Sequence, residues 1–152
     1  MQKKKISIIG SGNVANHLAQ IFFEKKLSIV EIYSRNKVEG KKLADKINVA
    51  YTSDIKAVGS NSDIIIMAIS DDAIPLVCNE LDLNDQVLAH TSGIANTEDL
   101  KIATKNYACF YPLQTFTKGH SVEFSNIPIL INAANAKTLS ELKTIAYKIS
   151  DT

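Results

Sequence analysis

The sequence predicts an α/β protein built on a doubly wound, mostly parallel β-sheet, in three α/β/α layers. Short apolar segments alternate with segments of helical periodicity along the whole chain. The segment 63–69 is a continuous apolar run, which is typical of a parallel strand covered on both faces. The segment 6–9 runs directly into a glycine turn and a helical pattern. With 152 residues, 45% of them hydrophobic, the chain suits one domain with one core.

The elements of the N-terminal half are predicted from helical periodicity and from short apolar runs. Apolar side chains at helical spacing predict helices over residues 14–25, 37–47 and 54–58, the last capped by Ser53 or Asp54. Runs of β-branched residues predict strands over residues 6–9, 27–36, 48–51 and 63–69.

The C-terminal half continues the alternation. Ser70 and the two acids after it are expected to cap a helix over residues 73–81. Thr97 is expected to open a further helix, and Asn135 to cap the last one, over residues 136–149. Strands are predicted over residues 86–90, 106–111 and 127–132. A long loop, residues 115–126, has a length that is often functional in a compact domain.

The segment Gly10–Ala15 reads Gly-Ser-Gly-Asn-Val-Ala and joins the first strand to the first helix. This is a dinucleotide-binding fingerprint in its proper context. The first glycine permits a tight turn, the second leaves room for a pyrophosphate, and the helix N-terminus favours the phosphate charge. The alternative is a glycine turn that only reverses the chain. The residues predicted to hold the pyrophosphate are Gly10, Ser11, Gly12, Asn13 and Val14.

The end of the second strand indicates which dinucleotide is bound. Ser34, Arg35 and Asn36 occupy this position, where NAD-binding sheets carry an acid. Arg35 can bind a 2′-phosphate through charge-assisted hydrogen bonds, and Lys37 can add a charge. Glu31 lies on the strand rather than at its tip, and we interpret it as structural. The predicted cofactor is NADP.

The fourth and fifth strands present further polar residues at their carboxyl ends, where doubly wound sheets bind ligands. These ends flank the expected place of the nicotinamide half. Asp71 has an alternative interpretation, as a first-turn helix acid only. The additional residues predicted to contact the cofactor are Ile69, Ser70, Asp71 and Thr91.

His90 is the candidate catalytic residue, because imidazole titrates in the range that a proton-transfer partner needs. The alternative is a histidine that hydrogen-bonds nearby backbone and shapes its loop. Phe116 is expected to form a wall of the pocket. His17 and His120 are interpreted as surface residues. The candidate substrate ligands are Ser92, Gly93, Tyr111 and Gln114, with Tyr111 alternatively a core residue.

Composition excludes several classes of function. The net charge of +1 argues against a nucleic-acid-binding protein. No apolar run approaches the roughly 20 residues of a membrane span, and none fits a signal peptide. Cys78 and Cys109 stand in apolar surroundings without metal-like spacing, so we expect reduced cysteines, no metal site and a cytoplasmic protein.

Four motifs together resemble a bacterial family of Rossmann-like candidate NADP oxidoreductases: Gly10–Ala15, Ser34-Arg35, His90–Gly93 and Tyr111–Phe116. That family is similar to pyrroline-5-carboxylate reductase and to deazaflavin-dependent NADP reductases. Its members carry a helical C-terminal domain of unknown function. The resemblance implies that residues 1–152 are the dinucleotide-binding domain, and that the helical domain for substrate binding and dimerisation is missing.

The resemblance implies an oxidoreductase that transfers hydride between NADP(H) and a small imino, keto or hydroxy substrate. The isolated domain is expected to bind NADP without turnover. Its partners would be a small molecule and a second copy of the protein, without nucleic acid or membrane. One alternative is a non-catalytic dinucleotide sensor or scaffold. Another is a site for S-adenosylmethionine or another adenine nucleotide, which Ser34 and Arg35 disfavour.

Overall fold

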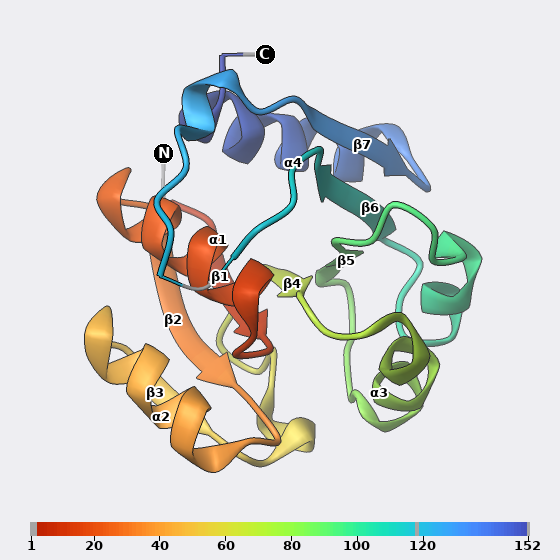
Figure 1. Cartoon of the computed structure of the whole chain (residues 1–152). Coiled ribbons are helices and arrows are strands. Elements are labelled where there is room, and N and C mark those ends of the chain that lie inside the picture. Colours follow the sequence, from red (N-terminus) through yellow and green to blue (C-terminus); the bar gives the residue numbers. More distant parts are fainter. Residues whose placement is uncertain (1–2, 118, 152) are drawn as a thin grey trace.

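The computed structural model describes residues 3–117 and 119–151, which form a single seven-stranded sheet (Figure 1). The strand order is β3-β2-β1-β4-β5-β6-β7. Neighbouring strands are parallel from β3 to β6, and β7 is antiparallel to β6. The predicted doubly wound, mostly parallel sheet is confirmed. The strands are β1 (Lys5–Ile9), β2 (Ser28–Tyr33), β3 (Ala50–Thr52), β4 (Ile64–Met67), β5 (Val87–His90), β6 (Tyr107–Pro112) and β7 (Ile129–Ala133).

Helices cover both faces of this sheet and complete the three layers. The helices α1, α2 and α4 pack on one face, and α3 with the 3-10 helices η1 and η3 packs on the other. The α-helices are α1 (Asn13–Glu24), α2 (Lys37–Lys46), α3 (Ile74–Glu80) and α4 (Ala136–Ile149). The 3-10 helices are η1 (Ile55–Ala57), η2 (Asp71–Ala73), η3 (Thr97–Ile102) and η4 (Phe124–Asn126).

Two local expectations need correction. The helix expected to open at Thr97 does begin there, but it is the 3-10 helix η3, and the Asn96 side chain caps it by accepting from the Glu98 N–H. Ser70 precedes η2 without a capping hydrogen bond from its side chain. The strand β7 pairs antiparallel with β6, and the described part of the connection between them contains the 3-10 helix η4 but no α-helix of the kind that joins parallel strands. This one antiparallel pair agrees with the predicted, mostly parallel sheet.

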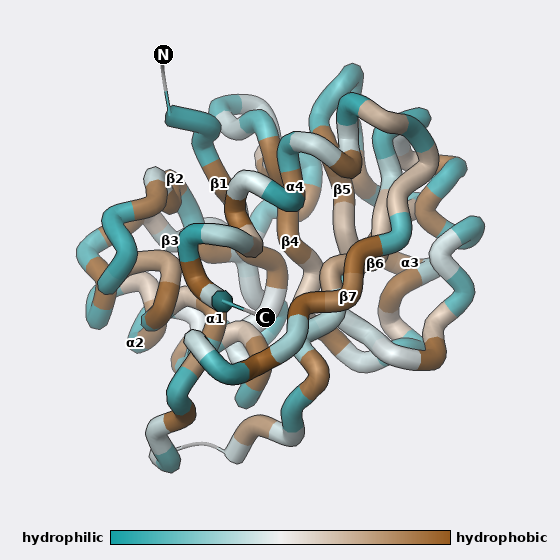
Figure 2. The backbone as a smooth tube through the Cα atoms, turned by 90° about the horizontal axis from the view of Figure 1, so that it is seen from above, coloured by the Kyte–Doolittle hydropathy of each residue, from teal (hydrophilic) through white to brown (hydrophobic). Residues whose placement is uncertain are grey.

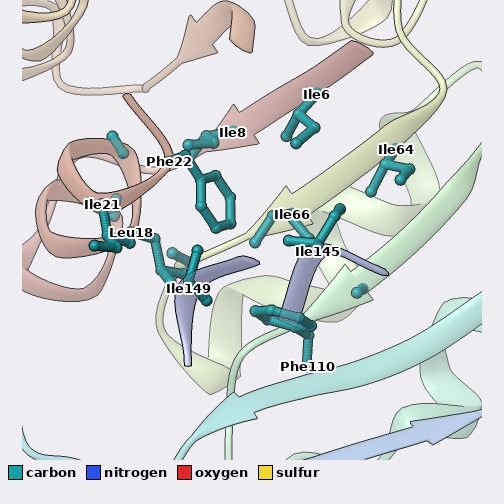
Figure 3. Packing of buried hydrophobic residues seen from close by; sticks show 14 of the residues in the cluster. Ile6, Ile8, Leu18, Ile21, Phe22, Ile64, Ile66, Phe110, Ile145 and Ile149 are labelled. Atoms are coloured by element: carbon teal, nitrogen blue, oxygen red, sulfur yellow. The ribbon is translucent and has the colours of Figure 1, made fainter. Parts of the chain in front are cut away.

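The core is divided by the sheet into two clusters. Successive side chains of a strand point to opposite faces, so Ile8 and Ile66 face α1 and α4 while Ile9 and Ile65 face α3. Phe22 of α1 is fully buried among the strands (Figure 3). Figure 2 shows hydrophobic segments along the central strands and hydrophilic ones on the outer helices. Burial of this kind is the main force that holds helix to sheet.

The chain leaves β1 through a turn that only glycine can make. Gly10 has φ +126°, and a Cβ placed on it would lie 2.2 Å from the carbonyl oxygen of Ala68. The Gly10 N–H donates to the carbonyl oxygen of Tyr33 (2.8 Å), and the Ala68 N–H donates to that of Ile9 (2.8 Å). The turn is therefore bonded to both neighbouring strands. It lies between β2 and β4, where the winding direction of the sheet reverses.

Both cysteines are free thiols. Burial raises the pKa of Cys78 to about 11 and also raises the pKa of Cys109. Neither thiol is therefore set up as a thiolate nucleophile. Among the described residues, no helix is both long enough and apolar enough to cross a lipid bilayer.

Replacement of Gly10 by alanine should lower the free energy of unfolding by at least about 2 kcal/mol, because it adds backbone strain and a backbone clash. The matched variant is Gly12→Ala. A Cβ at Gly12 meets no atom within 4 Å and the φ of −83° suits alanine, so its cost should stay below about 1 kcal/mol. Urea unfolding followed by circular dichroism measures both. Equal losses in the two variants would contradict this account of the turn.

Candidate functional site

A cleft of about 750 Å³ opens at the carboxyl ends of β1, β2, β4 and β5. This volume lies in the range of small-molecule and cofactor sites. Twelve of the residues predicted to contact the cofactor line it, from four separate segments of the chain, whereas Lys37 does not. They are Gly10, Ser11, Gly12, Asn13, Val14, Ser34, Arg35, Asn36, Ile69, Ser70, Asp71 and Thr91.

The middle of the cleft is suited to a pyrophosphate. The space above Gly12 is open, so an anion can approach its backbone. The first turn of α1 has no acidic residue, and no side chain caps it. The Asn16 side chain donates to the carbonyl oxygens of Ser11 (2.9 Å) and Gly12 (2.8 Å). These two carbonyls are engaged by the protein, and the positive end of the helix faces the cleft.

Ser34 joins the glycine turn after β1 to the end of β2. Its hydroxyl lies 2.7 Å from that of Ser11 and accepts from the Asn36 N–H at 3.1 Å. The Tyr51 hydroxyl donates to the Ser34 carbonyl oxygen (2.8 Å). Arg35 stands next to this network, exposed at the cleft. Within residues 3–117 and 119–151 its guanidinium has no ion pair or hydrogen bond to protein, so it is available to an anionic ligand.

The same end of the cleft contains residues that sequence analysis missed. Tyr33 lies there, and burial raises the pKa of its hydroxyl, as does the charge of Glu80, while Arg35 lowers it. The helix after β4 supplies Ala73, Leu76, Val77 and Glu80. Their spacing of i, i+3, i+4 and i+7 places them on one helix face. This period was visible in the sequence and could have identified them.

The opposite end of the cleft lies against β5 and β6. Of the candidate substrate ligands, Ser92 and Gln114 line it, together with Phe116, the expected wall. Thr91 lies beside them, and its hydroxyl donates to the Met67 carbonyl oxygen at 3.0 Å. None of these side chains is titratable. This end can form hydrogen bonds, but its described residues supply no acid or base.

His90 lies at the end of β5 but does not line the cleft, and it is 1% exposed. Its Nδ1 accepts from the Ser92 N–H (3.0 Å), so Nε2 carries the proton and donates to the Thr97 hydroxyl (2.8 Å). Burial lowers its pKa, although Asp71 and Asp99 partly oppose this. Both ring nitrogens are engaged, as in the alternative that the sequence left open. The catalytic role of His90 stays an untested prediction.

Gly93 and Tyr111 also lie outside the residues that line the cleft. A Cβ on Gly93 would lie 2.8 Å from the Tyr111 ring, so the two residues are in close contact with each other. The structure assigns this pair to loop packing, and contact with a substrate stays a prediction.

Glu31 is structural, as interpreted from its place on the strand. Its Oε2 accepts from the Ser7 hydroxyl (2.6 Å) and from the Gly59 N–H (3.2 Å). It does not line the cleft. No group of three His, Cys, Asp or Glu side chains suited to a metal ion occurs in the described part of the chain.

Solved structures with this fold include several oxidoreductases. A candidate NADP oxidoreductase from Bacteroides fragilis is 29% identical, with a TM-score of 0.88 over 98% of this chain and 59% of that one. Prephenate dehydrogenase from Aquifex aeolicus, in complex with NAD+, has a TM-score of 0.81 over 99% of this chain and 58% of that one. At 15% identity, the second likeness shows the fold alone.

Sequence comparison identifies relatives of the same kind. Pyrroline-5-carboxylate reductase from Aquifex aeolicus is 30% identical over 104 residues, which is 67% of this chain and 39% of the reductase. The chain thus spans well under two thirds of the length of these relatives. Residues 5–92, more than half of the chain, match the family described as NADP oxidoreductase, coenzyme F420-dependent. The chain therefore belongs to this family of NADP oxidoreductases.

Proposed function

We propose that this chain is the NADP-binding domain of an oxidoreductase. The enzyme would transfer hydride to or from a carbon–nitrogen or carbon–oxygen bond of a small substrate. One observation carries the proposal. An open glycine turn and the Arg35 guanidinium, which has no ion pair or hydrogen bond to the described residues, face the same cleft at the carboxyl ends of adjacent strands. No relative described above supports the alternative of a non-catalytic sensor.

The cleft suggests one orientation of the cofactor. Arg35 would bind the 2′-phosphate, with the adenine beside the α3 face that carries Leu76 and Val77. The turn at Gly12 would hold the pyrophosphate at the N-terminus of α1. The nicotinamide half would then extend toward Ser92 and Phe116. When bound, the cofactor supplies or accepts a hydride at this end.

The chemistry of the uncharged end favours an imine as substrate. Reduction of a carbonyl needs a proton donor at the oxygen, and among the described residues that line this end, Ser92, Gln114 and Phe116 included, none has a titratable side chain. A protonated imine already carries its proton and its positive charge. Pyrroline-5-carboxylate, the substrate named by one relative, belongs to this class. A deazaflavin is the second candidate, because the family description names coenzyme F420.

The remaining expectations concern the whole protein. We propose that a further helical domain closes the substrate side of the cleft and forms a homodimer, as the resemblance implies. The two free thiols, Cys78 and Cys109, support a reducing compartment such as the cytoplasm.

His90 fits this proposal as a positioning residue. It joins Ser92, which lines the cleft, to Thr97 of η3 through its two ring nitrogens. In this role it holds the segment after β5 in place without contact with the cofactor.

The decisive experiment has two parts. Calorimetry of the chain with NADPH, NADH and S-adenosylmethionine tests binding, and NADPH is expected to bind most tightly. The full-length protein is then assayed for NADPH oxidation with pyrroline-5-carboxylate, keto acids and a deazaflavin. Tighter binding of NADH would reject the NADP assignment. Absence of binding to any dinucleotide at millimolar concentration would reject the proposed function.

Replacement of Arg35 by alanine should weaken NADPH binding about 10- to 100-fold, the value of lost charge-assisted hydrogen bonds to the 2′-phosphate. NADH binding should change little, since NADH lacks that phosphate. Lys41→Ala removes the same charge from α2, where Lys41 pairs with Asp45 and does not line the cleft. Calorimetric titrations of the three proteins give the ratios. An equal loss for NADH and NADPH would contradict the assignment of Arg35.

The stability of the protein should fall as the pH drops below about 6.5, where unfolded histidine takes up a proton. The folded-state pKa of His90 is lowered by burial, so the unfolded chain binds more protons in this window. The contribution of neutral, buried His90 to stability is fully present above the pKa of histidine in the unfolded chain. It is lost as the pH falls toward and through the lower pKa of His90 in the folded protein. One group contributes a slope of at most about 1.4 kcal/mol per pH unit.

Urea unfolding between pH 5 and 8 measures this effect, with His90→Gln as the comparison. That variant is expected to be less stable at every pH, but with a smaller loss toward acid pH. His17 and His120 are present in both proteins and cancel in the difference. Identical pH profiles would show that His90 is not the group responsible.

A further inference from the structure

The histidine of α1, His17, is bonded to the loop after β6. Its Nε2 lies 2.9 Å from the carbonyl oxygen of Thr117, across 100 residues of sequence. A carbonyl oxygen only accepts, so Nε2 carries the proton and donates. The ring also stacks on Phe116, with centroids 4.9 Å apart and planes inclined by 30°. The sequence alone suggested a plain surface residue, and the structure overturns that interpretation.

We propose that His17 is a positioning residue that holds Phe116 as the wall of the cofactor cleft at its nicotinamide end. The inference rests on the proposed function, because it assigns the Phe116 end of the cleft to the nicotinamide half. It adds a residue that lies outside the cleft lining and acts through its neighbour.

Phe116 is held from two sides. It is 6% exposed and stacks on His17 and also on Phe124, whose ring centroid is 5.6 Å away at 20°. Phe116 also lines the cleft, next to Gln114 and Thr115. Stacked aromatic contacts of this kind each contribute about 0.5–1.5 kcal/mol beyond the buried area.

A second cavity lies on the side of the aromatic stack away from the cofactor cleft. His17 and Phe124 line this cavity of about 410 Å³ between α1, α2 and the loop. The stacked pair of His17 and Phe116 therefore stands between this cavity and the cofactor cleft. Without the imidazole, Phe116 would border a void and lose both contact area and a fixed orientation.

The described residues around Thr117 make mostly local hydrogen bonds. Two such bonds run from the His120 N–H to the Thr117 carbonyl oxygen and from Gln114 Nε2 to that of Thr115. His17 ties the loop to a distant element. It lies on α1 at i+4 from Asn13, on the same side of the helix. The helix that faces the pyrophosphate thus also holds the wall beside the nicotinamide.

The test compares His17→Ala with His120→Ala. His120 belongs to the same loop and the same second cavity, but neither stacks on Phe116 nor bonds Thr117 through its side chain. Two probes are titrated into each protein: NADPH, followed by its fluorescence, and adenosine 2′,5′-bisphosphate, which contains only the adenine end. Urea unfolding checks that each variant is folded.

His17→Ala should raise the Kd of NADPH about 3- to 10-fold, as expected for one hydrogen bond and one aromatic contact. It should also reduce the fluorescence of bound NADPH, because water reaches the nicotinamide. Binding of adenosine 2′,5′-bisphosphate should be unchanged, and His120→Ala should resemble the wild type for both probes.

Three results would overturn the inference. An equal loss for both probes would indicate general damage to α1. No change with NADPH would show that the wall does not depend on His17. The same loss in His120→Ala would trace the effect to the loop as a whole. Failure of the wild type to bind NADPH is a separate result, which rejects the proposed function and any cofactor role for His17 with it.

Discussion

The missing side chain at Gly10 is the constraint on which the rest of this structure depends. The backbone there lies so close to Ala68 that any Cβ would overlap its carbonyl oxygen at 2.2 Å. This contact lets β1 and β4 stay paired up to their ends and lets the chain turn at once into α1. The N-terminus of the helix consequently points at the crevice where the sheet reverses its winding. A bulkier turn would move the helix dipole away from the cleft.

A second constraint holds the end of β2, and with it Arg35, next to the glycine turn that contains Ser11. Ser34 is 4% exposed, and its hydroxyl and carbonyl bond Ser11, Asn36 and Tyr51. The helix α2 approaches this point through Gly40, where a Cβ would lie 2.6 Å from that of Ser34. The backbone of Arg35 is thus held by the hydrogen-bonded residue before it, Ser34, although the Arg35 side chain is exposed. Such support is what lets a surface arginine act as a specific ligand.

Sequence could predict what is encoded locally. The strand, glycine turn and helix around Gly12 are contiguous, and the strand tips are set by parallel topology, so residues predicted from these two features line the cleft. Tyr33 and the α3 face with Leu76 and Glu80 were missed. Contacts between distant segments left no such signal. His17 and Thr117 are 100 residues apart, and the stack with Phe116 depends on how a long loop folds back. His90 stands at a strand tip, but the turn after β5 folds over it and buries the ring.

The charged and the uncharged side chains of the cleft lie at opposite ends. Among the described residues, the cleft's titratable side chains are Tyr33, Arg35, Asp71 and Glu80, which come from the end of β2, from η2 and from α3. The end near β5 and β6 is formed by hydroxyl, amide and aromatic groups. Charge at one end can fix the cofactor by its phosphates while the other end stays neutral and sheltered by Phe116. Under the function proposed above, a hydride acceptor that brings its own positive charge, as a protonated imine does, suits such surroundings better than a neutral carbonyl that requires an acid.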